Sequence, residues 1–158
     1  MIDGLRTKKL KVITDDRGFL MEMLRSDDEI FEQFGQVYLT CVKQGVAKGW
    51  HYHQKQKDHF VCVAGKALVV LYDARENSPT RGEVNEFLLT QPGAEGEQLL
   101  VEIPIGVYHG FTAIDCEEAR IINIPTEKYN RENPDEHRVA WNSPEVPYQW
   151  PSGVVQGG

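Results

Sequence analysis

Short apolar runs broken by turn residues constrain the fold of this 158-residue chain more than any other feature. Apolar and β-branched residues cluster in runs of strand length, and Gly, Pro, Asn and Asp separate one run from the next. These runs cover residues 10–14, 18–24, 36–43, 59–64, 67–72, 84–90, 98–103 and 119–124. Eight or more short strands predict an all-β domain, built as a sandwich or a small barrel.

Helical signals are confined to two short segments. Ser26 and Glu29 have the spacing of a capping box, which predicts a short helix over residues 27–34, and a second short helical turn is expected over 126–131. No internal repeat or linker is visible, so we expect a single domain over residues 1–158. Residues 152–158 have only two valines as bulky apolar anchors, and we expect this tail to fray.

The charge balance limits the kinds of partner. Seventeen basic side chains against twenty-four acidic ones leave a net charge of -7, which repels a nucleic acid, and a few local cations must hold any anionic ligand. No apolar run approaches the ~20 residues of a membrane span, and the first residues lack the apolar core of a secretory signal. Three cysteines without C-x-x-C spacing fit reduced thiols. We therefore expect a cytoplasmic protein with no nucleic-acid or membrane partner.

Four polar residues form the most informative cluster. His51 and His53 share one face if they lie on a strand, and a neighbouring strand could bring Asp58 and His109 against them. His59 should point to the opposite face and serve a structural or interfacial role. Three imidazoles and a carboxylate could bind a divalent first-row metal ion and leave positions open for water or substrate. The same imidazoles could instead be hydrogen-bonded groups that work without an ion.

The spacing of these residues resembles the two cupin motifs. The first motif would contain Gly45, His51, His53, Asp58 and Gly65, and the second Pro104, Gly106 and His109. Asp58 stands where the first motif usually has Glu, and Ala113 stands where the second ends in Asn. The resemblance implies a cupin-type jelly-roll barrel or sandwich.

A second resemblance extends over residues 14–151. Its segments, in chain order, are DDRGFLME (15–22), KGWHY (48–52), DARENSPTRG (73–82), IPIGVYHGF (103–111), AWNSP (140–144) and WP (150–151). Together they are similar to the dTDP-4-dehydrorhamnose 3,5-epimerase family. The resemblance implies an enzyme of deoxysugar and polysaccharide biosynthesis that needs no cofactor. Such an enzyme removes a proton next to the keto group of a nucleotide-linked 4-keto-6-deoxyhexose and returns one to the other face.

The resemblance also implies roles for individual residues. His51 falls on the base, and His109 on a histidine that lines the sugar site. Lys48 stands beside the base, where the family has arginine. The implied nucleotide-binding residues are Arg17, Phe19, Glu22, Gln36 and Tyr129. A homodimer is implied as well, in which an N-terminal strand carries Arg17 and Glu22 into the partner's site.

Several positions depart from the family pattern. Asn123 replaces the tyrosine that acts as acid, Asp58 (next to Lys57) replaces a lysine, and Ser143 replaces an aspartate. His53 gives a further resemblance, to the sugar-nucleotide 3,4-ketoisomerases, small cupins in which paired histidines can move protons without the tyrosine.

Two other functions stay open. One is a metal-dependent cupin that acts on another small molecule, with His51, His53, Asp58 and His109 as ligands. The other is a sugar-nucleotide binder without catalytic activity, which the departures at Asn123 and Ser143 favour.

Overall fold

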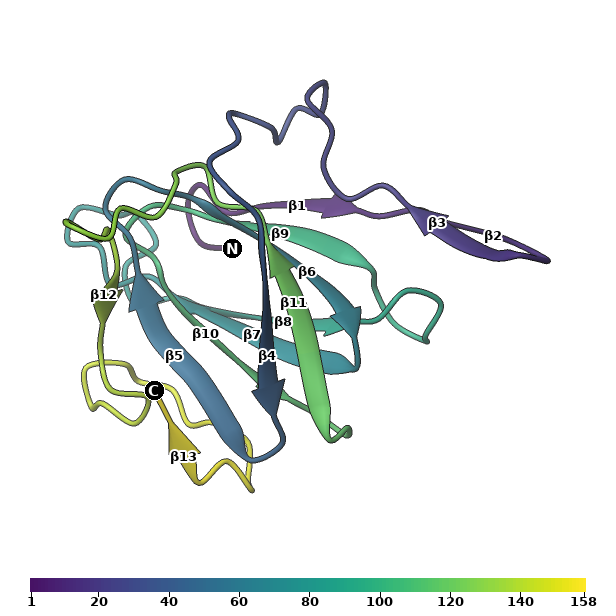
Figure 1. The fold of residues 1–158 in the computed structure, drawn as a ribbon. Coiled ribbons are helices and arrows are strands. Elements are labelled where there is room, and N and C mark those ends of the chain that lie inside the picture. The colour runs from purple at the N-terminus through teal and green to yellow at the C-terminus, as the bar shows by residue number, and fades with distance from the viewer.

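Two sheets packed face to face form the body of the computed structural model, which describes residues 1–158 (Figure 1). One sheet has the strand order β1 (Arg6–Lys9), β9 (Leu99–Ile103), β6 (Asp58–Ala64), β11 (Glu118–Asn123) and β4 (Tyr38–Lys43). The other has the order β12 (His137–Arg138), β5 (Val46–Tyr52), β10 (Tyr108–Ala113), β7 (Lys66–Tyr72) and β8 (Val84–Thr90). Neighbouring strands along both orders are antiparallel, so the all-β prediction is confirmed.

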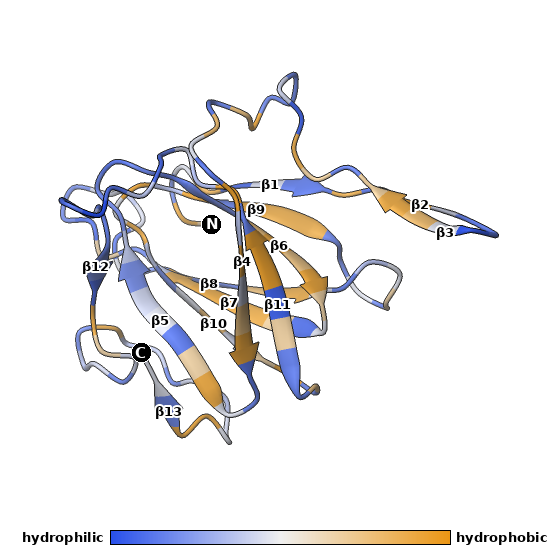
Figure 2. Ribbon diagram, viewed as in Figure 1, coloured by the Kyte–Doolittle hydropathy of each residue, from blue (hydrophilic) through white to orange (hydrophobic).

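The core lies between the two sheets and follows the two-residue period of strands. Phe60 and Cys62 of β6 face Val69 and Leu71 of β7, and all four side chains are buried in one apolar cluster. The alternate residues of β6 and β9, Val61 and Leu100, are buried too, in a second cluster on the outer face of their sheet. Central strands covered on both faces explain the nearly continuous apolar colouring of β6 and β9 in Figure 2.

A separate hairpin extends away from both sheets. It consists of β2 (Val12–Asp15) and β3 (Gly18–Met21), which pair only with each other. Figure 1 shows this hairpin projecting beyond the end of β1. Ile13, Phe19 and Leu20 are each more than half exposed, so the hairpin presents an apolar surface that its own chain does not cover.

The structure has no helix, so both helix predictions were wrong. In segment 27–34, the carbonyl oxygens of Glu29 and Ile30 accept hydrogen bonds from the guanidinium of Arg6, instead of from helical N–H groups. Segment 126–131 is held in an irregular conformation by Lys57, because the N–H of Thr126 donates to the Lys57 carbonyl at 3.0 Å. None of the segments is a helix long and apolar enough to cross a bilayer.

The C-terminal residues, expected to fray, are instead hydrogen-bonded to β5. Residues 156 and 157 form β13 (Gln156–Gly157), which pairs with β5 in parallel, and the N–H of Gly158 donates to Ala47 at 3.1 Å. The tail needs no large apolar side chain, because backbone hydrogen bonds along the edge of the sheet hold it.

Two glycines allow β5 and β10 to approach closely. A Cβ atom at Gly49 would lie 2.8 Å from the Cα of Gly110, and one at Gly110 would lie 2.9 Å from the carbonyl oxygen of Lys48. The register between the two strands shifts between His109 and Phe111, so the close approach coincides with an irregularity in the ladder. Gly110 directly follows His109, and Gly49 lies two residues before His51, so both glycines are close to histidines of the candidate site.

Candidate active site

Strand pairing brings the histidines together. His51 of β5 and His109 of β10 are direct partners in the antiparallel register, and their ring centroids are 6.1 Å apart. His53 lies two residues beyond His51, and its ring centroid is 5.5 Å from that of His109. Strand pairing and the two-residue spacing thus gather three imidazoles, one from β5, one from the residue directly after β5 and one from β10.

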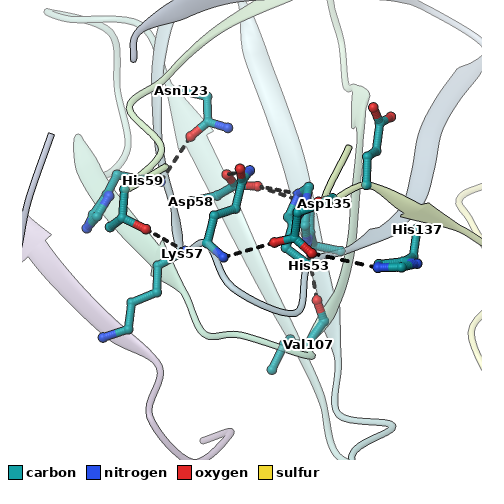
Figure 3. Close-up of polar contacts among 12 residues, drawn as sticks. His53, Lys57, Asp58, His59, Val107, Asn123, Asp135 and His137 are labelled. Atoms are coloured by element: carbon teal, nitrogen blue, oxygen red, sulfur yellow. Dashed lines mark hydrogen bonds and ion pairs between the residues drawn. The ribbon is translucent and has the colours of Figure 1, made fainter. Parts of the chain in front are cut away.

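Asp58 joins the histidines from the opposite sheet, and not from a neighbouring strand as the sequence analysis expected. It is the first residue of β6, and its side chain points toward His53 in Figure 3. Its Oδ2 atom lies 3.2 Å from Nε2 of His53 and 3.2 Å from Nε2 of His109, while Gln56 donates to Oδ1 at 2.9 Å. The carboxylate is 2% exposed, so these three donors replace the water that would otherwise solvate it.

The ionisation of this group follows from its hydrogen bonds. Burial opposes a charge on Asp58, but the hydrogen bonds from His109 and His53 hold the pKa of its carboxyl far below the usual range. Burial alone would lower the pKa of His53, yet the hydrogen bond and charge of Asp58 raise it above its ordinary value. The Nδ1 atom of His53 faces the carbonyl oxygen of Asp135, so both ring nitrogens face acceptors and favour the protonated ring.

His51 is in a different state. Neither of its ring nitrogens has a hydrogen-bond partner within the chain. Burial, with the nearby His109 and the charge of Arg138, lowers the pKa of His51 to about 4. The imidazole is therefore neutral near pH 7 and carries a free lone pair that can accept a proton.

A cavity of about 620 Å³ opens in front of His51, Asp58 and His109. Its polar lining residues are Gln36, Tyr38, Thr40, Lys48, His51, Gln56, Asp58, His109, Tyr129, Arg131, Glu136 and Arg138. They come from β4, β5, β6, β10, β12 and the segments that flank β4, β6 and β12. His53 does not line the cavity, and its side chain is 11% exposed. His53 therefore lies behind the cavity wall, in contact with Asp58 and beside His109.

The residues predicted to bind the nucleotide fall in two places. Gln36, Lys48 and Tyr129 line the cavity. Arg17 and Phe19 instead lie on the projecting hairpin, where Arg17 forms an ion pair with Asp15 at 2.5 Å. Glu22 follows the hairpin directly and pairs with Arg25 at 3.0 Å, also away from the cavity.

Three further residues considered in the sequence lie outside the cavity. Lys57 turns to the face opposite Asp58 and contacts Glu32 and Glu102, so it does not replace a lysine in the site (Figure 3). His59 is fully buried and bonds Ile124 at 2.8 Å and Glu102 at 3.1 Å, which agrees with the structural role we expected. Ser143 lies in a turn, where its hydroxyl accepts from the N–H of Glu145.

Some cavity residues were missed by the sequence analysis. Tyr38 and Thr40 follow Gln36 at two-residue spacing on one strand face, so the strand period alone could have placed them beside it. Arg138 is the strand partner of His51 in the β12 and β5 pair. A strand of two residues, such as β12, is too short to show a side-chain period in the sequence. Periodicity therefore could not have identified Arg138 as a cavity residue.

The four residues proposed as metal ligands are only partly assembled. His53, Asp58 and His109 place one potential ligand atom each within 4.8 Å of the others, whereas His51 is outside this group. In the hydrogen-bonded arrangement, both Nε2 atoms donate to Asp58. A metal ion there would have to replace those protons.

A jelly-roll sandwich with interior histidines facing a polar cavity defines a cupin-type enzyme, as the sequence predicted. Residues 1–156 match the family model described as dTDP-4-dehydrorhamnose 3,5-epimerase, and the chain belongs to that family. It is therefore a sugar-nucleotide epimerase or isomerase of a family that works in sugar biosynthesis.

Known proteins share most of the chain. The spore coat polysaccharide biosynthesis protein SpsL of Bacillus subtilis is 40% identical over 150 residues, which cover 95% of this chain and 97% of SpsL. The probable low-salt glycan biosynthesis epimerase Agl13 of Haloferax volcanii is 39% identical, and 94% of each chain is covered.

Solved structures show the same fold. A dTDP sugar isomerase from Desulfovibrio desulfuricans superposes with a TM-score of 0.86 at 30% identity, over 94% of this chain and 92% of that one. A 3,5-epimerase from Legionella pneumophila, in complex with dTDP-4-keto-L-rhamnose, has a TM-score of 0.83 at 26% identity, over 98% of this chain and 84% of that one.

Proposed function

We propose that the protein epimerises a nucleotide-linked 4-keto-6-deoxyhexose, and that His51 is the base that removes the proton next to the keto group. The observation that carries this proposal is the state of His51. It faces the cavity, is neutral near pH 7 and has no hydrogen-bond partner within the chain. A base must present such a lone pair to the substrate.

His53 and His109 donate hydrogen bonds to Asp58 at the base of the cavity. Asp58 receives hydrogen bonds from His53 and His109, so His109 presents its ring to the cavity in a fixed orientation. A proton that leaves carbon generates a negative charge on the substrate oxygen, and preorganised donors stabilise such a charge. His109 is the strand partner of His51, so the imidazole that Asp58 holds lies directly beside the proposed base.

Local cations support an anionic substrate. Lys48, Arg131 and Arg138 line the cavity of a chain whose net charge is -7. Guanidinium groups bind diphosphate oxygens with two parallel hydrogen bonds, and the ring of Tyr129, which is 52% exposed at the cavity, can stack on a nucleotide base.

A second copy of the chain completes the site in this proposal. Arg17 and Phe19 lie on a hairpin that extends away from its own cavity and exposes its apolar side chains. A symmetric dimer that exchanges hairpins would bury this surface and bring Arg17 to the diphosphate in the partner's cavity. The partners are thus the sugar nucleotide and a second protomer.

Proton exchange tests the function directly. The purified protein is incubated with dTDP-4-keto-6-deoxyglucose in D₂O, and proton NMR follows C3 and C5. We expect deuterium at one or both carbons with inversion, and at least about 100-fold slower exchange in His51→Gln. Binding of dTDP without exchange would indicate a binder, and movement of the keto group to C3 a ketoisomerase. Either result contradicts the proposal.

The metal alternative has its own measurement. The grouping of His53, Asp58 and His109 is the observation that favours it. Elemental analysis of the purified protein would then find about one first-row metal ion per chain, lost in His109→Ala. We expect exchange to persist after treatment with a chelator, because the proposed proton transfer uses side chains alone.

A further inference from the structure

Epimerisation needs a second proton-transfer group. One group removes a proton from carbon, and another must return a proton to the opposite face of the planar enolate. At position 123, where the family resemblance implies a tyrosine, the chain has Asn123, and an amide does not ionise usefully. Asn123 is also fully buried and does not line the cavity. The second group must therefore come from another part of the wall.

Tyr38 lies directly beside Asn123. The two residues are partners in the antiparallel register of β4 and β11, and Nδ2 of Asn123 is 2.8 Å from the hydroxyl oxygen of Tyr38. The orientation of the amide is determined by its other end, since Oδ1 of Asn123 accepts from the N–H of His59 at 3.0 Å (Figure 3). The Asn123 amide nitrogen therefore donates, and the phenol oxygen accepts.

This arrangement leaves the phenolic proton free. The hydroxyl of Tyr38 has no other hydrogen-bond partner in the chain, and Tyr38 lines the cavity. Its proton is therefore available to a bound ligand. Among the residues that line the cavity, Tyr129 is the other phenol, and it lies on a loop beyond β11 without a hydrogen bond to hold it.

Tyr38 and His51 reach the cavity from different sheets. Tyr38 begins β4, at the edge of the five-stranded sheet, whereas His51 is on β5 of the other sheet. A sugar ring held between the sheets would present one face to each residue. That is the disposition that inversion at carbon requires.

The phenol also has a suitable protonation state. Partial burial of a residue that is still 42% exposed, together with the negative charge of Asp58, raises the pKa of Tyr38 to about 12, while the hydrogen bond from Asn123 opposes that shift. The side chain keeps its proton at neutral pH and can serve as a donor. The same hydrogen bond would stabilise the tyrosinate left behind after donation.

We propose that Tyr38, positioned by Asn123, delivers the proton to the face of the sugar opposite His51. This step rests on the proposed function. His51 takes the proton, and the electrons of the broken C–H bond form the enolate. The Tyr38 O–H bond then breaks, and a C–H bond forms from the enolate electrons on the other face. Water in the cavity reprotonates the tyrosinate and removes the proton from His51.

Tyr38→Phe separates proton removal from proton delivery. In D₂O, the variant should incorporate deuterium at the wild-type position with retention of configuration, because His51 can return the deuteron to the face from which it came. Inversion should fall at least about 100-fold. The matched control is Tyr72→Phe, which removes a hydroxyl that has no hydrogen bond and lies outside the cavity, and it should invert at the wild-type rate.

Three outcomes would overturn the assignment. Inversion at the wild-type rate in Tyr38→Phe would exclude Tyr38 as the donor. Loss of exchange together with inversion, while dTDP still binds, would mean that the phenol stabilises the enolate instead. Loss of dTDP binding in a variant that melts like the wild type would make Tyr38 a binding residue. If the wild-type protein itself shows no exchange, the proposed function fails, and this step fails with it.

Discussion

Oδ2 of Asp58 lies 3.2 Å from Nε2 of His109, although neither side chain is more than 3% exposed. The same oxygen lies 3.2 Å from Nε2 of His53, so one buried carboxylate accepts hydrogen bonds from two imidazoles. A buried charge is stable only when it is paired in this way. The arrangement therefore keeps the Asp58 carboxylate charged and fixes the orientation of the His109 ring at the cavity.

Replacing the shared carboxylate should change the titration of His53. Burial lowers the pKa of His53, and the charge and hydrogen bond of Asp58 oppose that effect. Asp58→Asn removes the charge, so we expect the pKa of His53 to fall below its wild-type value. Because the folded-state pKa of His53 is raised in the wild type, its contribution to stability is present below the unfolded value of 6.5 and is lost as the pH rises through the folded value. That contribution should be reduced in the variant. NMR titration of the ring protons measures the shift, and Asp115→Asn, which removes an exposed partner of Lys66, should leave it unchanged.

His51 and His59 should separate activity from stability. His51→Gln removes a ring without hydrogen bonds, so the free energy of unfolding should change by less than about 0.5 kcal/mol while proton exchange falls at least about 100-fold. His59→Gln breaks buried bonds to Ile124 and Glu102 and should cost about 2 kcal/mol. Denaturant titration and exchange rates per folded molecule make the comparison. A large loss of exchange in His59→Gln would give that residue a role in the site.

The buried Glu102 should make stability depend on acid pH. Burial opposes its charge, but hydrogen bonds from His59 and Arg6 lower the pKa of its carboxyl to about 2 from 4.5. The resulting stability is present above pH 4.5 and is lost as the pH falls through about 2. The free energy of unfolding of Glu102→Gln should therefore be about 2 kcal/mol lower than that of the wild type at pH 7. This difference between the two proteins should shrink below about pH 4. Glu97→Gln, which removes an exposed pair with Lys9, should cost less than about 0.5 kcal/mol.

Mixed dimers should reveal whether hairpins are exchanged. Arg17→Ala and His51→Gln are each expected to be inactive alone. If Arg17 serves the partner's cavity, a heterodimer of the two variants contains one intact site, and random mixing should restore about a quarter of the wild-type activity. Exchange kinetics after mixing and refolding provide the measurement. No recovery, in a protein shown by light scattering to be dimeric, would mean that Arg17 does not act across the interface.

Periodicity made the floor of the cavity predictable. His51 lies on β5, His53 is the first residue after that strand, and β10 brings His109 to them, as their spacing indicated. The same period places Tyr38 beside Gln36, but a tyrosine in an apolar run resembles a core residue when only the sequence is visible. Its role depends on the partner strand, which puts Asn123 against its hydroxyl. That pairing joins residues 85 positions apart, which local patterns cannot anticipate.

Long-range hydrogen bonds also explain the wrong helices. Ser26 and Glu29 do have capping spacing, yet Asp28 accepts from the N–H of Arg25 and pairs with Lys8 of the edge strand. The guanidinium of Arg6 donates hydrogen bonds to the carbonyl oxygens of Glu29 and Ile30, which in a helix would accept from backbone N–H groups. Local propensity is a weak guide when the partners of a short segment come from elsewhere in the chain.

The crowding of Gly49 against Gly110 places a limit on how the enzyme can diversify. Any larger residue at either position would push apart the two strands that bear His51 and His109. Substitutions that reshape the cavity can therefore fall on its side walls, but neither glycine can gain a side chain without moving the two strands that carry His51 and His109.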